Sequence, residues 1–186
     1  MQQSSHNLDR LGVEFSEPNL ISNAGLLLPA TLARQLGLGQ LLSKHVDLGD
    51  AVGHAHVADK ALTLIASVLA GGDCINDAAA LRAAGSEKVL GHKVAAPSTL
   101  GSYLRSFSFG HARQLDKVSG EALCRAWRAG AGPGKDKLTI DIDSTVIETY
   151  GQKKQGGADI TYHGGRGYHP LLATAAELGD VIHSRL

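Results

Sequence analysis

The chain has 186 residues, 43% of them hydrophobic, which is enough to bury one core or two small ones. Eighteen Lys and Arg balance eighteen Asp and Glu, so no overall excess of charge points to a nucleic acid or a membrane surface. No stretch approaches the roughly 20 apolar residues that span a bilayer, and the two cysteines, Cys74 and Cys124, have no CxxC spacing. We therefore expect a cytoplasmic protein with no membrane partner.

The neutral total hides three unequal segments. Residues 1–81 carry four basic and eight acidic side chains, residues 82–128 carry eight and three, and residues 129–186 carry six and seven. The middle segment therefore has a net charge of +5 between two acidic neighbours. Such a segment is typical of a region that contacts phosphate, although a solvated helix face explains it equally well.

Apolar residues recur at helical spacing between Ala24 and Gly130, and glycines stand where the runs end. This pattern predicts five or six helices. Asn76 is expected to cap a helix over 77–84. The residues that mark one face of each remaining run are Leu28, Leu32 and Leu36, then Leu62, Ile65 and Leu69, and finally Leu115, Val118, Ala122 and Ala126.

The pattern changes after Gly130. Residues 138–143 alternate with period two and predict a strand, whereas residues 151–167 are polar and Gly-rich and predict a long loop. Two short apolar runs, 171–177 and 181–186, are separated by the turn residues 178–180. We expect three strands after the helices, with one apolar sheet face uncovered unless the sheet lies against the helical part.

The strand over 138–143 places its apolar residues on one face and Thr139, Asp141 and Asp143 on the other. Two carboxylates on one face repel each other unless a cation or solvent screens them, and Asp is uncommon in strands. Carboxylate oxygens are the ligands that Mg²⁺ and Mn²⁺ prefer. The pair suggests a Mg²⁺ or Mn²⁺ site, and an exposed edge strand with two solvated aspartates is the alternative.

Several segments resemble insertion-sequence transposases of the Asp-Asp-Glu class, most closely the group numbered thirteen-eighty. They are Asp143-Ser-Thr145, Tyr150-Gly-Gln-Lys-Lys154, and the run from Tyr162 to Ala173, in which Arg166-Gly-Tyr-His-Pro170 is the most specific piece. Members of this group have an N-terminal helical region, represented here by residues 25–42, 61–82 and 97–107. The resemblance therefore runs over nearly the whole chain.

The resemblance implies an α+β fold with three parts. These are a polar N-terminal arm over 1–23, a helical DNA-binding region over 24–130, and the first three strands of an incomplete ribonuclease-H-like domain over 135–186. Asp143 matches the first catalytic and metal-binding Asp of the family, and Asp141 is the second choice. The later Asp and Glu of the family have no counterpart, so this chain is expected to be a truncated fragment that is inactive alone.

The implied cofactor is Mg²⁺ or Mn²⁺ in the complete catalytic domain. The implied partner is DNA, both the element ends and the target, in the nucleoid of the cytoplasm, and the resemblance also allows a homodimer. In the family the loop with Arg166, Tyr168 and His169 adjoins the catalytic face. We therefore expect these residues, together with Lys153 and Lys154, to contact DNA, with a solvated loop as the alternative.

A DNA-recognition helix is expected over 98–107, with Leu100, Leu104 and Phe107 turned inward and Arg105 turned outward toward DNA. An ordinary bundle helix fits the same residues. A protein that only binds DNA is therefore a second interpretation of the chain.

A third interpretation is enzymatic but different in class. Asp141-Ile-Asp143-Ser-Thr145 also matches the nucleophile motif of haloacid-dehalogenase-like phosphatases. In such an enzyme Asp141 would attack phosphorus and Asp143 would act as the acid and base. The match covers five residues, and little chain follows it.

Overall fold

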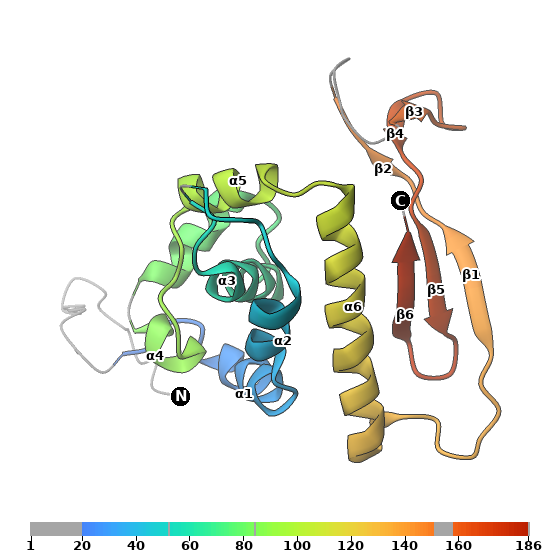
Figure 1. Ribbon diagram of the computed structural model, residues 1–186, viewed down its shortest axis with the longest axis horizontal. Coiled ribbons are helices and arrows are strands. Elements are labelled where there is room, and N and C mark those ends of the chain that lie inside the picture. Colours follow the sequence, from blue (N-terminus) through green and yellow to red (C-terminus); the bar gives the residue numbers. More distant parts are fainter. Residues whose placement is uncertain (1–19, 52, 84, 151–157, 186) are drawn as a thin grey trace, which may run out of the picture.

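The computed structural model describes residues 20–51, 53–83, 85–150 and 158–185. Figure 1 shows a helical part on one side of the long helix α6 and two small sheets on its other side. The expected α+β class is confirmed. None of the helices in these described ranges is long and apolar enough to cross a bilayer.

In the described residues, the helical part contains six α-helices and three helices of other types. The α-helices are α1 (Leu27–Gln35), α2 (Leu38–His45), α3 (Val57–Leu69), α4 (Ser86–Leu90), α5 (Pro97–Arg105) and α6 (Phe109–Ala126). Two 3-10 helices span Ala24–Leu26 and Ile75–Arg82, and a π-helical turn, Trp127–Ala131, follows α6.

The helix ends follow local chemistry. Pro97 stands at the first position of α5, where its fixed φ suits a helix and its missing N–H is not needed. Ser108 and His111 form a reciprocal cap at the start of α6. Gly37 separates α1 from α2 with a φ of 66°, a left-handed conformation that favours glycine.

The cap expected at Asn76 is wrong. The chain instead forms a 3-10 helix over Ile75–Arg82, and Cys74 is its N-cap residue. Asp77 Oδ2 accepts the backbone N–H groups of Asp73 and Cys74 at 3.0 and 2.9 Å. The helix therefore starts two residues earlier than expected, because the Asp77 carboxylate satisfies the backbone N–H groups of Asp73 and Cys74.

Two clusters of buried side chains form the core of the helical part. One gathers residues of α2, α3, α5 and α6 and the α2–α3 connection: Leu41, Leu42, Val46, Leu48, Ala61, Tyr103 and Val118. The other gathers residues of α3, α4, the connection after α4 and the two 3-10 helices: Leu26, Ala66, Leu81, Val89, Leu90 and Val94. Burial raises the pKa of Tyr103 to about 12, so its hydroxyl stays protonated near neutral pH.

The apolar stripes identified the helices but not the buried faces. Leu28 and Leu32 of α1 are 78% and 53% exposed, and Ile65 and Leu69 of α3 are exposed as well. The buried side of α3 is formed by smaller or polar residues, among them Ala66. Helix periodicity is a local property, whereas the choice of buried face depends on which helices pack nearby.

A buried lysine ties the connection before α3 to that helix. Lys60 is buried, and its Nζ donates to the backbone carbonyls of Gly53 and Ala55. The same Nζ lies 5.8 Å from the centre of the Tyr103 ring. Carbonyl oxygens and the ring face therefore compensate the buried charge.

The sheet part contains two three-stranded antiparallel sheets. The principal sheet has the order β1-β5-β6, with β1 (Ile140–Ser144), β5 (Leu171–Ala175) and β6 (Asp180–Arg185). The second has the order β2-β4-β3, with β2 (Ile147–Glu148), β3 (Asp159–Ile160) and β4 (Arg166–Tyr168).

The expected count of three strands and the expected loop over 151–167 are therefore wrong in part. The described end of that segment carries β3 and the start of β4. These strands have two and three residues, too few to leave an alternating pattern in the sequence. The principal sheet does contain the three strands that the sequence indicated, with β1 starting at Ile140 rather than at 138.

One side chain of the helical part holds the principal sheet. The Trp127 indole Nε1 donates to Asp180 Oδ2 at 2.7 Å, which links the end of α6 to the start of β6. Figure 1 shows α6 running along β6, with β1 at the opposite edge of the sheet. Ile140 and Ile142 of β1 are 53% and 67% exposed, so the apolar face of this strand is uncovered.

Candidate functional site

Strand β1 carries the two aspartates on one face of the principal sheet. Asp141 lies opposite Thr174 and Asp143 lies opposite Leu172 in β5. Residues two apart in a strand point to the same side, so both carboxylates share a face, and both residues are exposed. Asp143 Oδ1 accepts the backbone N–H of Ser144 at 2.7 Å, which fixes the orientation of that carboxylate.

The same aspartates lie in no three-membered ligand group among the residues that the structure describes. The one such group found there is Asp73, Cys74 and Asp77, whose ligand atoms lie within 4.8 Å of one another. Hydrogen bonds from the Cys74 and Asp73 backbones lower the pKa of Asp77 and account for this cluster as a helix cap. The spacing of Cys74 and Asp77, three residues apart as in a capping box, is the sequence signal that could have found it.

Glu148 and Glu177 are the next carboxylates to consider beside Asp143. Glu148 lies in β2, where it is opposite Gly167 of the second sheet. Glu177 lies in the turn after β5, and its carboxylate accepts the Thr139 backbone N–H at 3.2 Å to Oε1 and 2.9 Å to Oε2. Glu177 therefore positions the start of β1 rather than joining Asp143.

The Arg166-Gly-Tyr-His-Pro170 segment begins with β4, the central strand of the second sheet, and His169 and Pro170 follow that strand. Arg166 lies opposite Ile160, and Tyr168 opposite Ile147. The ring centres of His169 and Tyr162 lie 6.2 Å apart. These residues thus belong to an ordered sheet next to β1, while Lys153 and Lys154 lie outside the described residues.

Gly167 explains why this segment needs a glycine. A Cβ at this position would lie 2.7 Å from the Ile147 carbonyl oxygen and 2.9 Å from Thr161 Cγ2. No side chain fits between strands at those distances. The glycine therefore permits the close approach of β2, β3 and β4.

The helix expected to recognise DNA corresponds to α5. Leu100 is fully buried as expected, but Leu104 is 44% exposed, and the second inward residue is Tyr103. Phe107, beyond the helix end, packs edge-on against Tyr103 with 4.9 Å between ring centres. Arg105 is exposed as expected, and its Nη2 donates to Ser102 Oγ at 3.3 Å.

The basic residues of segment 82–128 come from several elements of the helical part. They are distributed over the 3-10 helix Ile75–Arg82, α4, α5, α6 and the turns beside them, and Figure 1 shows α4 and α6 on opposite sides of the helical part. Arg125 has a structural role, because its Nη1 donates to the Leu36 carbonyl oxygen at 2.6 Å. That contact caps the end of α1.

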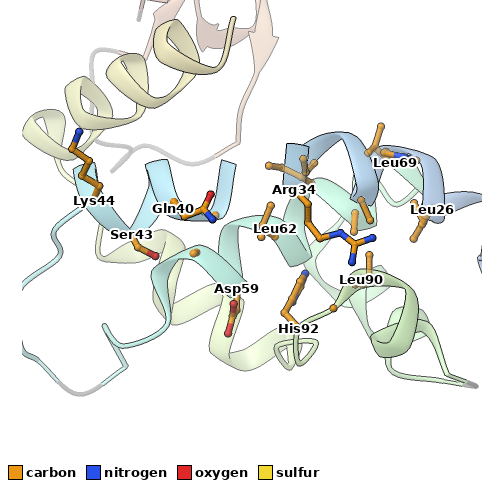
Figure 2. A pocket seen from close by; sticks show the side chains of 18 residues that line it. Leu26, Arg34, Gln40, Ser43, Lys44, Asp59, Leu62, Leu69, Leu90 and His92 are labelled. Carbon is orange, nitrogen blue, oxygen red and sulfur yellow. The ribbon is translucent and has the colours of Figure 1, made fainter. Parts of the chain in front are cut away.

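A cavity of about 780 Å³ lies between α1, α2, α3 and α4. Its walls are mostly apolar, and Figure 2 shows Arg34 and His92 close to Leu90 at one end, with Ser43 and Lys44 at the other. None of the aspartates of β1 lines it. The cavity is therefore separate from the acidic face of the principal sheet.

The comparisons with known proteins give one match. The sequence model of the family described as "Transposase DDE domain group 1" matches residues 3–186. The chain belongs to this family. No curated protein and no solved structure matches the chain.

The family assignment decides between the interpretations of Asp141 and Asp143. The match includes the whole Asp141-Ile-Asp143-Ser-Thr145 motif, so the chain is a DDE transposase relative and the phosphatase interpretation loses its support. The structure agrees, because both aspartates lie within the β1 ladder rather than in a loop after the strand. The assignment to the thirteen-eighty group stays a prediction.

The contact between Glu177 and Thr139 should make the stability of this transposase domain sensitive to acid. Hydrogen bonds from Thr139 lower the pKa of Glu177 below its ordinary value of 4.5. Because the pKa is lowered, the charged Glu177 carboxylate stabilises the fold at pH values above 4.5. This contribution is lost as the pH falls through the lowered pKa. In urea unfolding, Glu177→Gln should be less stable than wild type at neutral pH and equally stable in strong acid. A constant difference at every pH would contradict this.

Gly167→Ala should separate the strands of the second sheet. The added Cβ cannot be accommodated without moving the backbone of β2, which costs about 1–3 kcal/mol locally. Amide hydrogen exchange should then lose the protection of Thr149 N–H, bound to the Arg166 carbonyl, and of Thr161 N–H, bound to the Gly165 carbonyl. Gly165→Ala is the matched control, since its Cβ would meet no atom closer than 3.9 Å. Equal protection in both variants would refute this account of Gly167.

Proposed function

We propose that the chain serves in DNA transposition, binding DNA and supplying the first metal-binding carboxylate of a DDE transposase. Asp143 is that carboxylate and Asp141 is the second choice. The observation that supports the proposal is the exposed acidic face of β1 within a chain of the transposase family. The family match also covers the chain after Asp143, which contains Arg166 and Tyr168 in β4 and His169 directly after it.

The donor set fits Mg²⁺ or Mn²⁺. Both ions prefer carboxylate oxygens, and Asp143 presents an exposed carboxylate whose Oδ1 is already oriented by the Ser144 N–H. When bound, such an ion acts as a Lewis acid on phosphate oxygens and lowers the pKa of bound water. Asp143 would hold the ion, and the hydrogen bond from Ser144 would preserve the direction of the carboxylate. Asp141, on the same face, would add negative charge that attracts the ion.

The strand order supports a ribonuclease-H-like start for the catalytic domain. Residues 135–186 contribute an antiparallel three-stranded sheet in which β5 lies between β1 and β6, and the second sheet is formed by the chain between β1 and β5. The proposed domain organisation keeps a polar arm over 1–23 and a DNA-binding helical region over 24–130. We propose that the protein acts in the cytoplasm, at the nucleoid, because DNA is its proposed partner.

The DNA contacts proposed are those of Arg105 on α5, of Arg166, Tyr168 and His169 on and beside β4, and of Lys153 and Lys154. Arg105 is exposed at the end of α5, and the π faces of Tyr168 and His169 suit stacking on bases. The spread of basic residues over several elements supports weak binding along the phosphate backbone.

The first prediction for this function concerns the metal. The chain alone should not nick supercoiled plasmid with Mg²⁺ or Mn²⁺, because two-metal phosphoryl transfer needs more carboxylates than β1 brings together. Mn²⁺ should nevertheless bind at β1 and broaden the amide NMR signals around Asp143. Asp143→Asn should abolish this broadening.

The control for that experiment is Asp77→Asn, which alters the other acidic cluster and should leave the broadening at β1 unchanged. Nicking that depends on Asp143 would contradict the expected inactivity. Broadening that survives in Asp143→Asn but not in Asp77→Asn would remove Asp143 from the metal site and favour a chain that only binds DNA.

The second prediction concerns DNA affinity. Each phosphate contact contributes about −0.9 to the slope of log K against log[salt], so three or four contacts should give a slope near −3. Fluorescence anisotropy with a labelled duplex should show this slope. Arg105→Ala and Arg166→Ala should each weaken binding and reduce the slope by about 1.

Lys135→Ala is the matched control for these variants, because it removes an exposed positive charge outside segment 82–128 and away from β4. Its affinity should equal that of the wild type. Binding that does not depend on salt, or equal losses in all three variants, would contradict a defined DNA-contacting surface.

A further inference from the structure

The cavity of about 780 Å³ between α1, α2, α3 and α4 is an open groove with mostly apolar walls. Leu62, Ile65 and Leu69 of α3 line it, and the last two of these side chains are exposed. Figure 2 shows Leu69 and Leu90 at the end of the groove that also carries Arg34. An exposed apolar groove of this size, within the roughly 300–1,000 Å³ typical of binding sites, indicates that another group docks in it.

The described chain starts beside that end of the groove. Ser86 Oγ, at the start of α4, donates to the Ser22 carbonyl oxygen at 3.0 Å. Ile21 packs against the buried cluster that contains Leu26 and Leu90, and both leucines also line the groove. The preceding nineteen residues of the chain are therefore tethered next to the groove.

Those preceding residues have a pattern that suits an apolar groove. Leu11 and Phe15 stand four positions apart. Side chains four apart lie on the same side of the backbone both in an α-helix and in a β-strand, so either conformation presents the pair to one surface. Three acidic side chains against one basic side chain give residues 1–19 a net side-chain charge of −2. Two of the acidic residues, Glu14 and Glu17, flank Phe15.

The groove carries the opposite charge. Arg34 and Lys44 line it together with one acidic residue, Asp59. Arg34 Nη2 donates to the neutral Thr31 hydroxyl at 3.3 Å, and no ion pair among the described residues involves Arg34. Its guanidinium can therefore pair with a carboxylate that enters the groove at this end.

We propose that the N-terminal segment of this chain, residues 8–17, docks in the groove. Phe15 would lie against Leu69, and Leu11 would lie against Leu62, farther along α3. The acidic residues that flank Phe15 would then face the guanidinium at the tethered end of the groove. Because the occupant belongs to the same chain, docking requires neither DNA nor a second copy.

The lengths of the segment and the groove agree. Leu62 and Leu69 lie about 10 Å apart along α3, at about 1.5 Å per residue. Leu11 and Phe15 lie about 6 Å apart along a helix and about 13 Å apart along a strand, so both side chains can contact α3 at once. The chain from Phe15 to Leu20 spans up to about 17 Å when extended.

The tether itself favours this occupant. A connection of this length holds the N-terminal segment at an effective concentration on the order of millimolar near the groove. A free partner of equal affinity would have to reach a comparable concentration to displace it. Docking would also shield the exposed Ile65 and Leu69 side chains from solvent.

Nuclear Overhauser effects between the Phe15 ring protons and the methyl protons of Ile65 and Leu69 test the docking in the full chain. Wild type should show both contacts at low protein concentration. Leu69→Asn should remove the contact between Phe15 and Ile65, because a polar side chain then interrupts the apolar wall. Val68→Asn is the matched control, since Val68 is exposed on the same helix but does not line the groove, and it should keep the contact.

A second experiment supplies the segment in trans. The full chain with Leu11→Asp and Phe15→Asp should lose the docked state and bind more 1-anilinonaphthalene-8-sulfonate than wild type does, because the apolar groove is then open to the dye. A synthetic peptide of residues 1–19 should bind this double variant and displace the dye. Adding Arg34→Ala to the double variant should lower the affinity for the peptide about two- to fivefold, the range of a partly exposed ion pair.

The control for the second experiment is Gln2→Asp with Gln3→Asp, which adds the same charge without changing the apolar residues and should bind dye as wild type does. The ring contact between Tyr103 and Phe107, in the other buried cluster, reports that each variant is folded. Absence of the Phe15 contacts in wild type, their survival when the α3 wall is interrupted, or equal dye binding by wild type and the double variant would overturn the proposal. Contacts that grow with protein concentration, together with a dimer in sedimentation velocity, would overturn it as well and assign the groove to a second copy.

Discussion

The pairing of β1 with β5 sets the geometry on which the acidic face depends. Its hydrogen-bonded positions are odd-numbered, so the backbone groups of Asp141 and Asp143 are committed to β5 while their carboxylates stand on one exposed face. Glu177 reinforces this arrangement by accepting the Thr139 N–H at the start of the strand. A slip of one residue would turn both carboxylates to the other face and the isoleucines with them.

The principal sheet is held to the helical part by few interactions. The Trp127 to Asp180 hydrogen bond and the packing of α6 along β6 join the two parts at one edge, and β1 stands at the other. The helical part, by contrast, has two buried clusters and a capped succession of helices. Lys60 is buried and bonded to backbone carbonyls, so not every basic residue of the chain is available to a nucleic acid.

The family assignment gives the aspartates of β1 a chemical context that geometry alone does not supply. A solvated edge strand would also present an exposed pair of carboxylates without a third ligand nearby. The cluster of Asp73, Cys74 and Asp77 is a tighter group, but its hydrogen bonds explain it as a helix cap. The transposase match over residues 3–186 spans both clusters, and the metal role of Asp143 belongs to the proposed function.

The sequence by itself determined the class and the order of the parts, because helical spacing up to Gly130 and period-two alternation after it are local properties. It also determined the shared face of Asp141 and Asp143, since alternation follows from strand geometry alone. Tertiary structure decided which faces are buried: Leu28, Leu32 and Leu104 are exposed, because the neighbouring helices pack against other residues. It also decided that the Gly-rich segment before Pro170 forms β3 and β4, because strands of two and three residues are specified by their partners across the sheet and not by a pattern of their own.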